Sequence, residues 1–130
     1  MVHCVASQFQ SGDHVLEACP KVPSKIPEVW GPSGWFFLHV MAANYPTEPD
    51  AEYTNACSSF VSSLPYMLPC GDCGKHLQKL VRETDLAHVC ATRDNLHSFV
   101  SEAHNKVNVR NGKDPETCEL SRWLEVPLCR

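Results

Sequence analysis

The sequence predicts an all-α protein, a four-helix bundle with a short fifth helix. Apolar residues recur at intervals of three and four in four separate segments, which is the spacing of one face of a helix. The connections between these segments are short, and short connections favour antiparallel neighbours within one bundle. No segment alternates apolar and polar residues as convincingly as a strand would, and a length of 130 residues suits a single domain.

The first helix is expected to begin at Gly31-Pro32-Ser33 and to end before Pro46. It has almost no polar face, so it must be buried on more than one side. One side would meet the core, and the other would meet a cofactor, a partner subunit or both. Trp35 and His39 lie four residues apart on one face, which suits a planar aromatic ligand, although a simple core position explains Trp35 as well.

The second helix fits residues 49 to 64 and carries the most regular apolar stripe. Its apolar residues follow one another at helical spacing: Tyr53, Ala56, Cys57, Phe60, Val61 and Leu64. The segment 64–69 contains two prolines, so it ends this helix and leads the chain to Cys70.

The third helix, over about 71–84, begins with a Cys-x-x-Cys pair, Cys70 and Cys73. Leu77 and Leu80 follow Cys73 at i+4 and i+7, which places both cysteines in the first turn. Unpaired N–H groups and the helix dipole lower the pKa of a thiol at that position. Two thiols at this spacing form a redox-active pair, half of a zinc site or an inert bridge, and redox chemistry is the interpretation we favour.

The fourth helix runs from about 92 to 109 and carries a polar line beside its apolar face. Its inward residues are Leu96, Phe99, Val100, Ala103 and Val107. The polar line consists of His97, Ser101, His104 and Asn108. Buried polar groups need partners, which either a polar heterocycle bound in the bundle or the protein itself could supply.

The two ends of the chain are expected to lie outside the bundle. Residues 1–29 hold three prolines and few periodic apolar positions, which indicates a loosely attached N-terminal arm. A short last helix is expected around 117–124, and its Trp123 fits either a core position or the wall of a ligand site. We therefore expect the domain to cover 30–126 and a C-terminal tail to cover 127–130.

Charge and composition argue against several classes of partner. The chain is 43% hydrophobic and 20% charged, as in ordinary globular proteins, and its formal net charge is −4. Since basic residues form no cluster, a nucleic-acid-binding surface is not expected. No apolar run approaches the length of a membrane span and no secretory signal is visible, so we expect no membrane partner.

Cysteine is frequent for a chain of this length. The eight cysteines are Cys4, Cys19, Cys57, Cys70, Cys73, Cys90, Cys118 and Cys129. Their even number suggests pairing, but many connectivities are compatible with it. Frequent cysteine is typical of an oxidising compartment. Because no secretion signal is visible, the protein either enters such a compartment by another route or makes disulfides itself.

Four groups of residues occur in a fixed order along the chain. The first is Trp30-Gly31-Pro32-x-x-Trp35-x-x-Leu38-His39-x-x-Ala42-x-x-Tyr45-Pro46. The others are Pro69-Cys70-x-x-Cys73, then His104-Asn105-x-Val107-Asn108, then Gly112-Lys113 with Cys118 and Arg122-Trp123. Together they resemble the Erv/ALR family of FAD-linked sulfhydryl oxidases, with matching order and spacing from about residue 30 to residue 124.

The resemblance implies a bundle that holds FAD between its helices, usually in a homodimer. It implies that Cys73 is the sulfur next to the flavin and that Cys70 is the sulfur attacked by substrate. The residues that it implies in cofactor binding are Gly31, Gly34, Trp35, His39, Tyr45, Cys73, His104, Asn105, Val107, Asn108, Lys113, Arg122 and Trp123. It implies no metal site.

The implied activity is that of an FAD-dependent sulfhydryl oxidase that forms disulfides in protein substrates. Electrons would pass through Cys70 and Cys73 to FAD and then to O2, giving H2O2. The implied partners are reduced protein thiols or a thioredoxin-like carrier, molecular oxygen and a second copy of the chain. The compartments that suit such a member are the cytoplasm of an infected host cell, a virion or the mitochondrial intermembrane space.

Three positions depart from the family pattern. Leu68 replaces a common tyrosine, Glu102 replaces a common histidine, and Ser101 replaces a cysteine of a further structural bridge. Cys57 and Cys90 are consequently unmatched. They could pair with each other or remain buried thiols, which is the commoner case.

The terminal cysteines also have counterparts in the family. Cys19 and Cys118 match a disulfide that joins the N-terminal arm to the C-terminal region, within or between subunits. Cys129 and Cys4 lie near the chain ends, where a shuttle cysteine could carry electrons from bulky substrates to Cys70. Cys129 could instead tie down the tail as a structural half-cystine.

Two other classes of function stay open from the residues alone. A zinc-binding module could use Cys70, Cys73, His76 and either His88 or Cys90. A cofactor-free thiol–disulfide exchange module of the thioredoxin type needs a βαβ context around the motif, which the sequence does not indicate.

Overall fold

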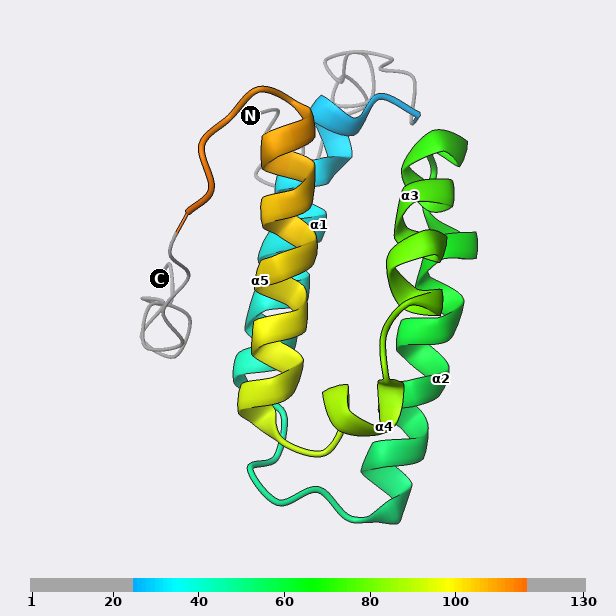
Figure 1. Ribbon diagram of the computed structural model, residues 1–130, viewed down its shortest axis with the longest axis vertical. Coiled ribbons are helices and arrows are strands. Elements are labelled where there is room, and N and C mark those ends of the chain that lie inside the picture. Colours follow the sequence, from blue (N-terminus) through cyan, green and yellow to red (C-terminus); the bar gives the residue numbers. More distant parts are fainter. Residues whose placement is uncertain (1–24, 117–130) are drawn as a thin grey trace, which may run out of the picture.

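Five helices make up the described part of the chain, residues 25–116, in a computed structural model of the protein (Figure 1). They are α1 (Pro27–Ala43), α2 (Ala51–Met67), α3 (Gly71–Arg82), α4 (Leu86–Val89) and α5 (Arg93–Arg110). The four long helices alternate in direction, and no strand occurs among these residues. The predicted all-α class and four-helix bundle are confirmed.

α1 begins at Pro27 rather than at Gly31, where the sequence pattern placed its start. Ile26 precedes it in an extended conformation, and Pro27 takes the first helical position, where its missing N–H removes no hydrogen bond. Pro32 lies inside the helix and removes one backbone donor without ending it. The prediction was wrong because both prolines carry the same signal for a helix start.

The other boundaries follow the expected pattern with two differences. α2 continues past the predicted end at Leu64 to Met67, with Pro65 inside the helix. α4 was not predicted, because a helix of 4 residues is too short to show an apolar period. It forms because the Asp85 side chain caps it, accepting hydrogen bonds from the backbone N–H groups of Ala87 (3.0 Å) and His88 (3.3 Å).

Several expectations concern residues outside the described range. These are residues 1–24 of the N-terminal arm, the last helix over 117–124, the C-terminal tail and the terminal residues Cys4, Cys19, Cys118, Arg122, Trp123 and Cys129. The end of the predicted arm, from Pro27 to residue 29, is helical and belongs to α1.

The bundle consists of two helical pairs. α1 packs along α5, and α2 packs along α3, as Figure 1 shows. The core that joins the two pairs gathers toward the end where α4 lies, and its buried members are Ala42, Tyr45, Cys57, Val61, Val89, Cys90, Leu96, Phe99 and Val100. The pairs are therefore held together chiefly at one end, which we call the closed end.

A disulfide between Cys57 of α2 and Cys90 after α4 fixes the closed end. The Tyr45 hydroxyl donates to the Cys90 carbonyl oxygen at 2.9 Å, and Arg93 Nε donates to the Tyr45 carbonyl oxygen at 2.6 Å. We call these contacts of Cys57, Cys90, Tyr45 and Arg93 the clasp. The commoner expectation for Cys57 and Cys90, two buried thiols, was wrong, because the turn before α4 brings their Cα atoms to 5.8 Å.

Two aromatic side chains on α1 remain about half-exposed in the described structure. Phe36 is 49% exposed and Phe37 is 59% exposed, although the helix has almost no polar face. The expected burial on more than one side is thus not completed within residues 25–116. None of the helices described there has the length and apolar character needed to cross a membrane.

Candidate active site

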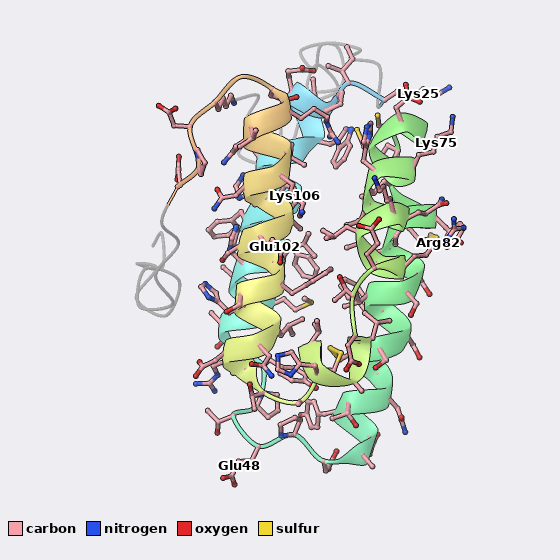
Figure 2. All side chains as sticks on the ribbon, in the orientation of Figure 1. Lys25, Glu48, Lys75, Arg82, Glu102 and Lys106 are labelled. Atoms are coloured by element: carbon pink, nitrogen blue, oxygen red, sulfur yellow. A yellow bond between two sulfur atoms is a disulfide. The ribbon has the colours of Figure 1, made fainter. Side chains whose placement is uncertain are left out.

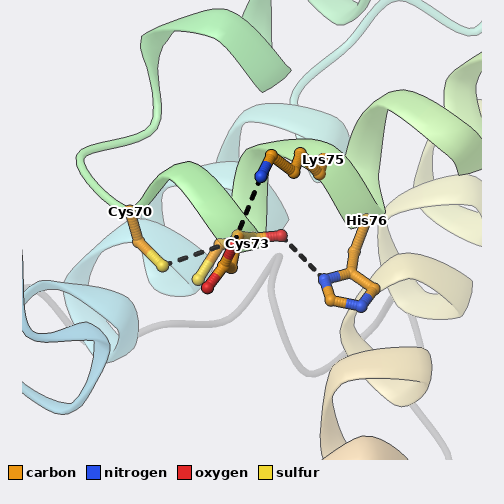
Figure 3. A network of polar contacts seen from close by, with 5 residues as sticks. Cys70, Cys73, Lys75 and His76 are labelled. Carbon is orange, nitrogen blue, oxygen red and sulfur yellow. Dashed lines mark hydrogen bonds and ion pairs between the residues drawn. The ribbon is translucent and has the colours of Figure 1, made fainter.

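Cys70 and Cys73 lie at the N-terminus of α3, at the end of the bundle opposite the clasp. Cys70 is the N-cap residue, and its Sγ accepts a hydrogen bond from the backbone N–H of Cys73 at 3.3 Å (Figure 3). Both cysteines are half-buried thiols. The predicted position in the first helical turn is confirmed.

Gly74 allows α3 to begin in this place. A Cβ atom at position 74 would lie 2.5 Å from the carbonyl oxygen of Pro65, near the end of α2. The first turn of α3 therefore rests directly on the backbone of α2, and any larger residue would push the two cysteines away. The sequence analysis did not identify Gly74, because the sequence alone does not show which part of the backbone packs against a glycine.

The two thiols differ in acidity. The pKa of Cys70 is lowered, first because its sulfur receives hydrogen bonds from the side chain and backbone of Cys73. The pKa of Cys73 is raised to about 11 by burial and by the neighbouring Cys70 sulfur. The expected depression of a thiol pKa in the first turn thus holds for Cys70 and was wrong for Cys73, where loss of solvation outweighs the helix terminus.

A groove of about 540 Å³ separates the two helical pairs above the closed end. Cys73 lines it from α3, whereas Cys70 is not part of its lining. Of the other predicted site residues, it is lined by Gly31, Gly34, Trp35 and Val107. The fold therefore brings one sulfur of the pair and four predicted cofactor residues to a single concave surface.

The walls of the groove are apolar and its rim is charged. The apolar lining includes Leu38, Phe60, Leu64, Leu77 and Leu80. The charged or titratable lining residues are His76, Lys79, Glu83, Lys106 and Arg110. Figure 2 shows Lys106 on α5 and, in contrast, Arg82 pointing from α3 away from α5. Such a surface suits a planar ring system in the interior and an anionic group at the rim.

Two further observations indicate that the groove fits a bound molecule. The indole Nε1 of Trp30, a lining residue, is buried and has no hydrogen-bond partner among residues 25–116. A Cβ atom on Gly31 would meet nothing within 4 Å, so the wall is open there. A buried donor without a partner is unfavourable, and a ligand acceptor would remove that penalty.

Behind Trp35, three predicted residues meet between α1 and α5. The Trp35 and His104 rings are stacked, with centroids 4.3 Å apart and planes 6° from parallel. His39 is fully buried, and its Nε2 lies 2.9 Å from Nδ1 of His104. His97 continues the line, with its ring centroid 6.2 Å from that of His39. Burial lowers the pKa of both His97 and His104, so these rings are neutral at neutral pH.

Four more predicted cofactor residues lie within residues 25–116 and do not line the groove: Tyr45, Asn105, Asn108 and Lys113. The Asn105 amide accepts from the backbone N–H of Glu116 at 2.9 Å and donates to its carbonyl oxygen at 2.8 Å. The backbone N–H of Lys113 donates to the Asn108 carbonyl oxygen at 2.8 Å. Asn105 and Asn108 thus hold the segment after α5 against that helix, while Tyr45 belongs to the clasp.

The structure bears on both rival interpretations. Cys90, one of the proposed zinc ligands, is bonded to Cys57 at the closed end, so the set containing Cys90 does not assemble. Residues 25–116 contain no group of three or more His, Cys, Asp or Glu side chains arranged to hold a metal ion. The cysteine pair lies at the start of α3, and the element before it is another helix, α2, so the βαβ context of a thioredoxin-type motif is absent from this region.

Comparison with known proteins adds a family relationship. The model of the Erv1 / Alr family matches residues 32–126. The protein 347L of Invertebrate iridescent virus 6, which bears the name of an FAD-linked sulfhydryl oxidase, is 33% identical over 104 residues, covering 75% of this chain and 94% of its own length. The mitochondrial FAD-linked sulfhydryl oxidase ERV1 of Saccharomyces cerevisiae is 33% identical over 122 residues, covering 92% of this chain. This chain spans 62% of the yeast protein.

Solved structures share the fold. The crystal structure of the yeast Erv1 core superposes with a TM-score of 0.70 at 29% identity, covering 90% of this chain and 92% of that one. The FAD-binding domain of Erv1 from Saccharomyces cerevisiae superposes with a TM-score of 0.65 at 32% identity, covering 74% of this chain and 88% of that one.

Proposed function

This chain belongs to the Erv1/Alr family, and we propose that it is an FAD-dependent sulfhydryl oxidase that forms disulfides in protein substrates. Electrons pass through Cys70 and Cys73 to FAD and then to O2, giving H2O2. The observation that carries this proposal is that Cys73 lines the groove while Cys70 lies outside its lining. One sulfur therefore faces the cofactor site and the other remains available to a substrate.

The groove and its surroundings fit FAD. The apolar walls, Gly31, Gly34, Trp35 and Val107 suit the flavin ring, and the unpartnered Trp30 donor offers it a hydrogen bond. Bound FAD supplies the capacity to accept two electrons from a dithiol and to pass them to oxygen. The other residues proposed to hold the nucleotide, over a domain of residues 30–126, are His39, His104, Asn105, Asn108, Lys113, Arg122 and Trp123. Tyr45 is left out of this set because its hydroxyl is committed to the clasp.

The exchange step follows from the different positions of the two sulfurs. In the oxidised pair, a substrate thiolate attacks Cys70 Sγ, and the bond between Cys70 and Cys73 breaks with its electron pair going to Cys73 Sγ. A second substrate thiolate then attacks the substrate sulfur of the mixed disulfide and releases Cys70. The substrate dithiol becomes a disulfide, and the Cys70–Cys73 pair takes up two electrons. The lowered pKa of Cys70 makes it a good leaving group in the second attack.

The chain also offers an interface for a second copy of itself. The exposed aromatic residues of α1, together with half-exposed Tyr53 on α2, leave apolar surface that a homodimer would cover. The proposed substrates are reduced protein thiols or a thioredoxin-like carrier. The Cys19–Cys118 bridge and the shuttle role of Cys129 remain proposals about residues outside the described range.

The test is the visible spectrum of the purified full-length protein combined with an oxidation assay. We expect one non-covalent FAD per chain and H2O2 release in step with the loss of thiols from a reduced protein substrate. A colourless protein that gains no flavin absorbance on refolding with FAD would overturn the proposal. Bound zinc in such a preparation would favour the metal-binding alternative.

A further inference from the structure

The opposite directions of α3 and α5 place the start of one helix beside the end of the other. α3 faces the groove with Cys73, His76, Leu77 and Leu80, and α5 faces it with Ala103, Lys106, Val107 and Arg110. α3 runs away from the open end and α5 runs toward it (Figure 1). Cys73 in the first turn of α3 and Arg110 at the last residue of α5 therefore share the open end of the groove.

Most of the charges that face the groove are already balanced on their own helix. Lys79 Nζ lies 4.0 Å from a Glu83 carboxylate oxygen, and Lys106 Nζ lies 3.4 Å from a Glu102 carboxylate oxygen. α1 and α2 contribute only uncharged residues to the lining. Arg110 has no ion pair within residues 25–116. Unlike the two lysines, it therefore presents a positive charge to the groove that no neighbouring carboxylate balances.

The Cys73 sulfur needs such a charge when it is ionised. Burial and the nearby Cys70 sulfur both raise its pKa, and the C-terminal end of α5, which points to the same end of the groove, carries partial negative charge. The charge of Arg110 acts in the opposite direction and lowers the pKa of Cys73. When the Cys70–Cys73 bond breaks, the electron pair arrives on Cys73 at this position.

We propose that Arg110 is a positioning residue that stabilises the Cys73 thiolate from across the groove. Its consequence for catalysis rests on the proposed oxidase function, since the thiolate forms each time substrate attacks Cys70. The effect on Cys73 itself does not require flavin or substrate.

The experiment measures the alkylation rate of Cys73 against pH in the full-length Cys70→Ser protein without flavin. Iodoacetamide is the probe, and mass spectrometry of the peptide that contains Cys73 separates it from the other cysteines. Below the pKa, Arg110→Gln should slow alkylation about threefold by reducing the thiolate fraction, and added salt should shrink the difference. Arg110→Lys should restore the rate.

Arg82→Gln is the matched control, because Arg82 is exposed on α3 and points away from α5 (Figure 2). It removes the same charge and should leave the profile unchanged. An unchanged profile in Arg110→Gln, or an equal shift in Arg82→Gln, overturns the proposal. Since no step of the measurement uses flavin, a protein that fails as an oxidase still gives a decisive answer about Arg110.

Discussion

The Trp35 indole stacks on the His104 imidazole, with centroids 4.3 Å apart and planes 6° from parallel. This contact joins α1 to α5 beside the groove, and His39 supports it from behind through its 2.9 Å contact with His104. Because Trp35 also lines the groove, the orientation of a groove-lining ring depends on a histidine that lies on another helix.

Replacing His104 with Ala should therefore lower flavin affinity about tenfold. The variant loses both the ring that orients Trp35 and the partner of the buried His39 Nε2, and each contact is worth about 1 kcal/mol. Titration of flavin-free protein with FAD measures the change. His88→Ala is the control, because His88 is exposed on α4, and equal losses in the two variants would refute the role of His104.

The two cysteines of the pair should give different spectra when replaced singly. Cys70→Ser leaves the Cys73 sulfur in the groove wall, so its thiolate should add a long-wavelength charge-transfer band to bound oxidised flavin. Because burial raises the pKa of Cys73, and this cause persists without Cys70, the band should strengthen as the pH rises. Cys73→Ser should show no band, and both variants should lose thiol oxidation. The opposite spectra would reverse the proposed roles.

Removing the bridge of the clasp should destabilise the protein. Cys57 and Cys90 are 33 residues apart in sequence, and closing a loop of that length is worth about 3–4 kcal/mol. The double variant Cys57→Ala with Cys90→Ala should lose that much free energy of unfolding in a urea titration under non-reducing conditions. Cys70→Ser with Cys73→Ser is the control for loss of two cysteines. A loss below about 1 kcal/mol in the clasp variant would show that the bridge does not limit unfolding.

Stability should fall on mild acidification because of the buried histidines. Burial lowers the pKa of His97 and His104 in the folded protein, so the unfolded chain binds protons at a higher pH than the folded one. The contribution of these histidines to the free energy of unfolding is then complete above about pH 6.5, the ordinary histidine pKa, and it is lost as the pH falls below that value. Thermal unfolding of the wild type and of His97→Gln, measured between roughly pH 5 and pH 7, tests this loss of stability, because histidine titrates in that range. A pH dependence that is equal in both proteins would assign the effect to other groups.

The exposed aromatic face of α1 should hold two chains together. Light scattering at micromolar concentration is expected to report a dimer for the wild type and a shift toward monomer for Phe36→Ser. Val109→Ser serves as the control, since Val109 is 59% exposed on α5. A monomeric wild type would contradict the proposed interface directly.

The sequence predicted the parts of the site that depend on local period. The helical spacing of Trp35 and His39, and the polar line that contains His104, indicated surfaces that do meet in the structure. The position of Cys70 and Cys73 in a first turn followed from the apolar residues behind them. Each of these predictions needed only the geometry of one helix.

Features that depend on contacts between helices were not predictable in the same way. The Cys57–Cys90 bridge depends on the unpredicted α4, and the need for Gly74 comes from the backbone of α2. Arg110 gave no signal, because an arginine in the last turn of a helix is ordinary until the opposite wall of the groove is known. The acidity of Cys73 was misjudged for a related reason, since burial is a property of the assembled bundle.

Because the clasp joins the helical pairs at the closed end, a small rotation of one pair about that end produces a larger displacement at the open end. α1 contains 17 residues, so at 1.5 Å per residue it is about 25 Å long. A rotation of about 5° at the clasp would move the far end by about 2 Å, roughly the difference between a sulfur in contact with a ring and one out of contact. The position of Cys73 on the groove wall is therefore decided partly by atoms at the other end of the molecule, where Cys57 is joined to Cys90.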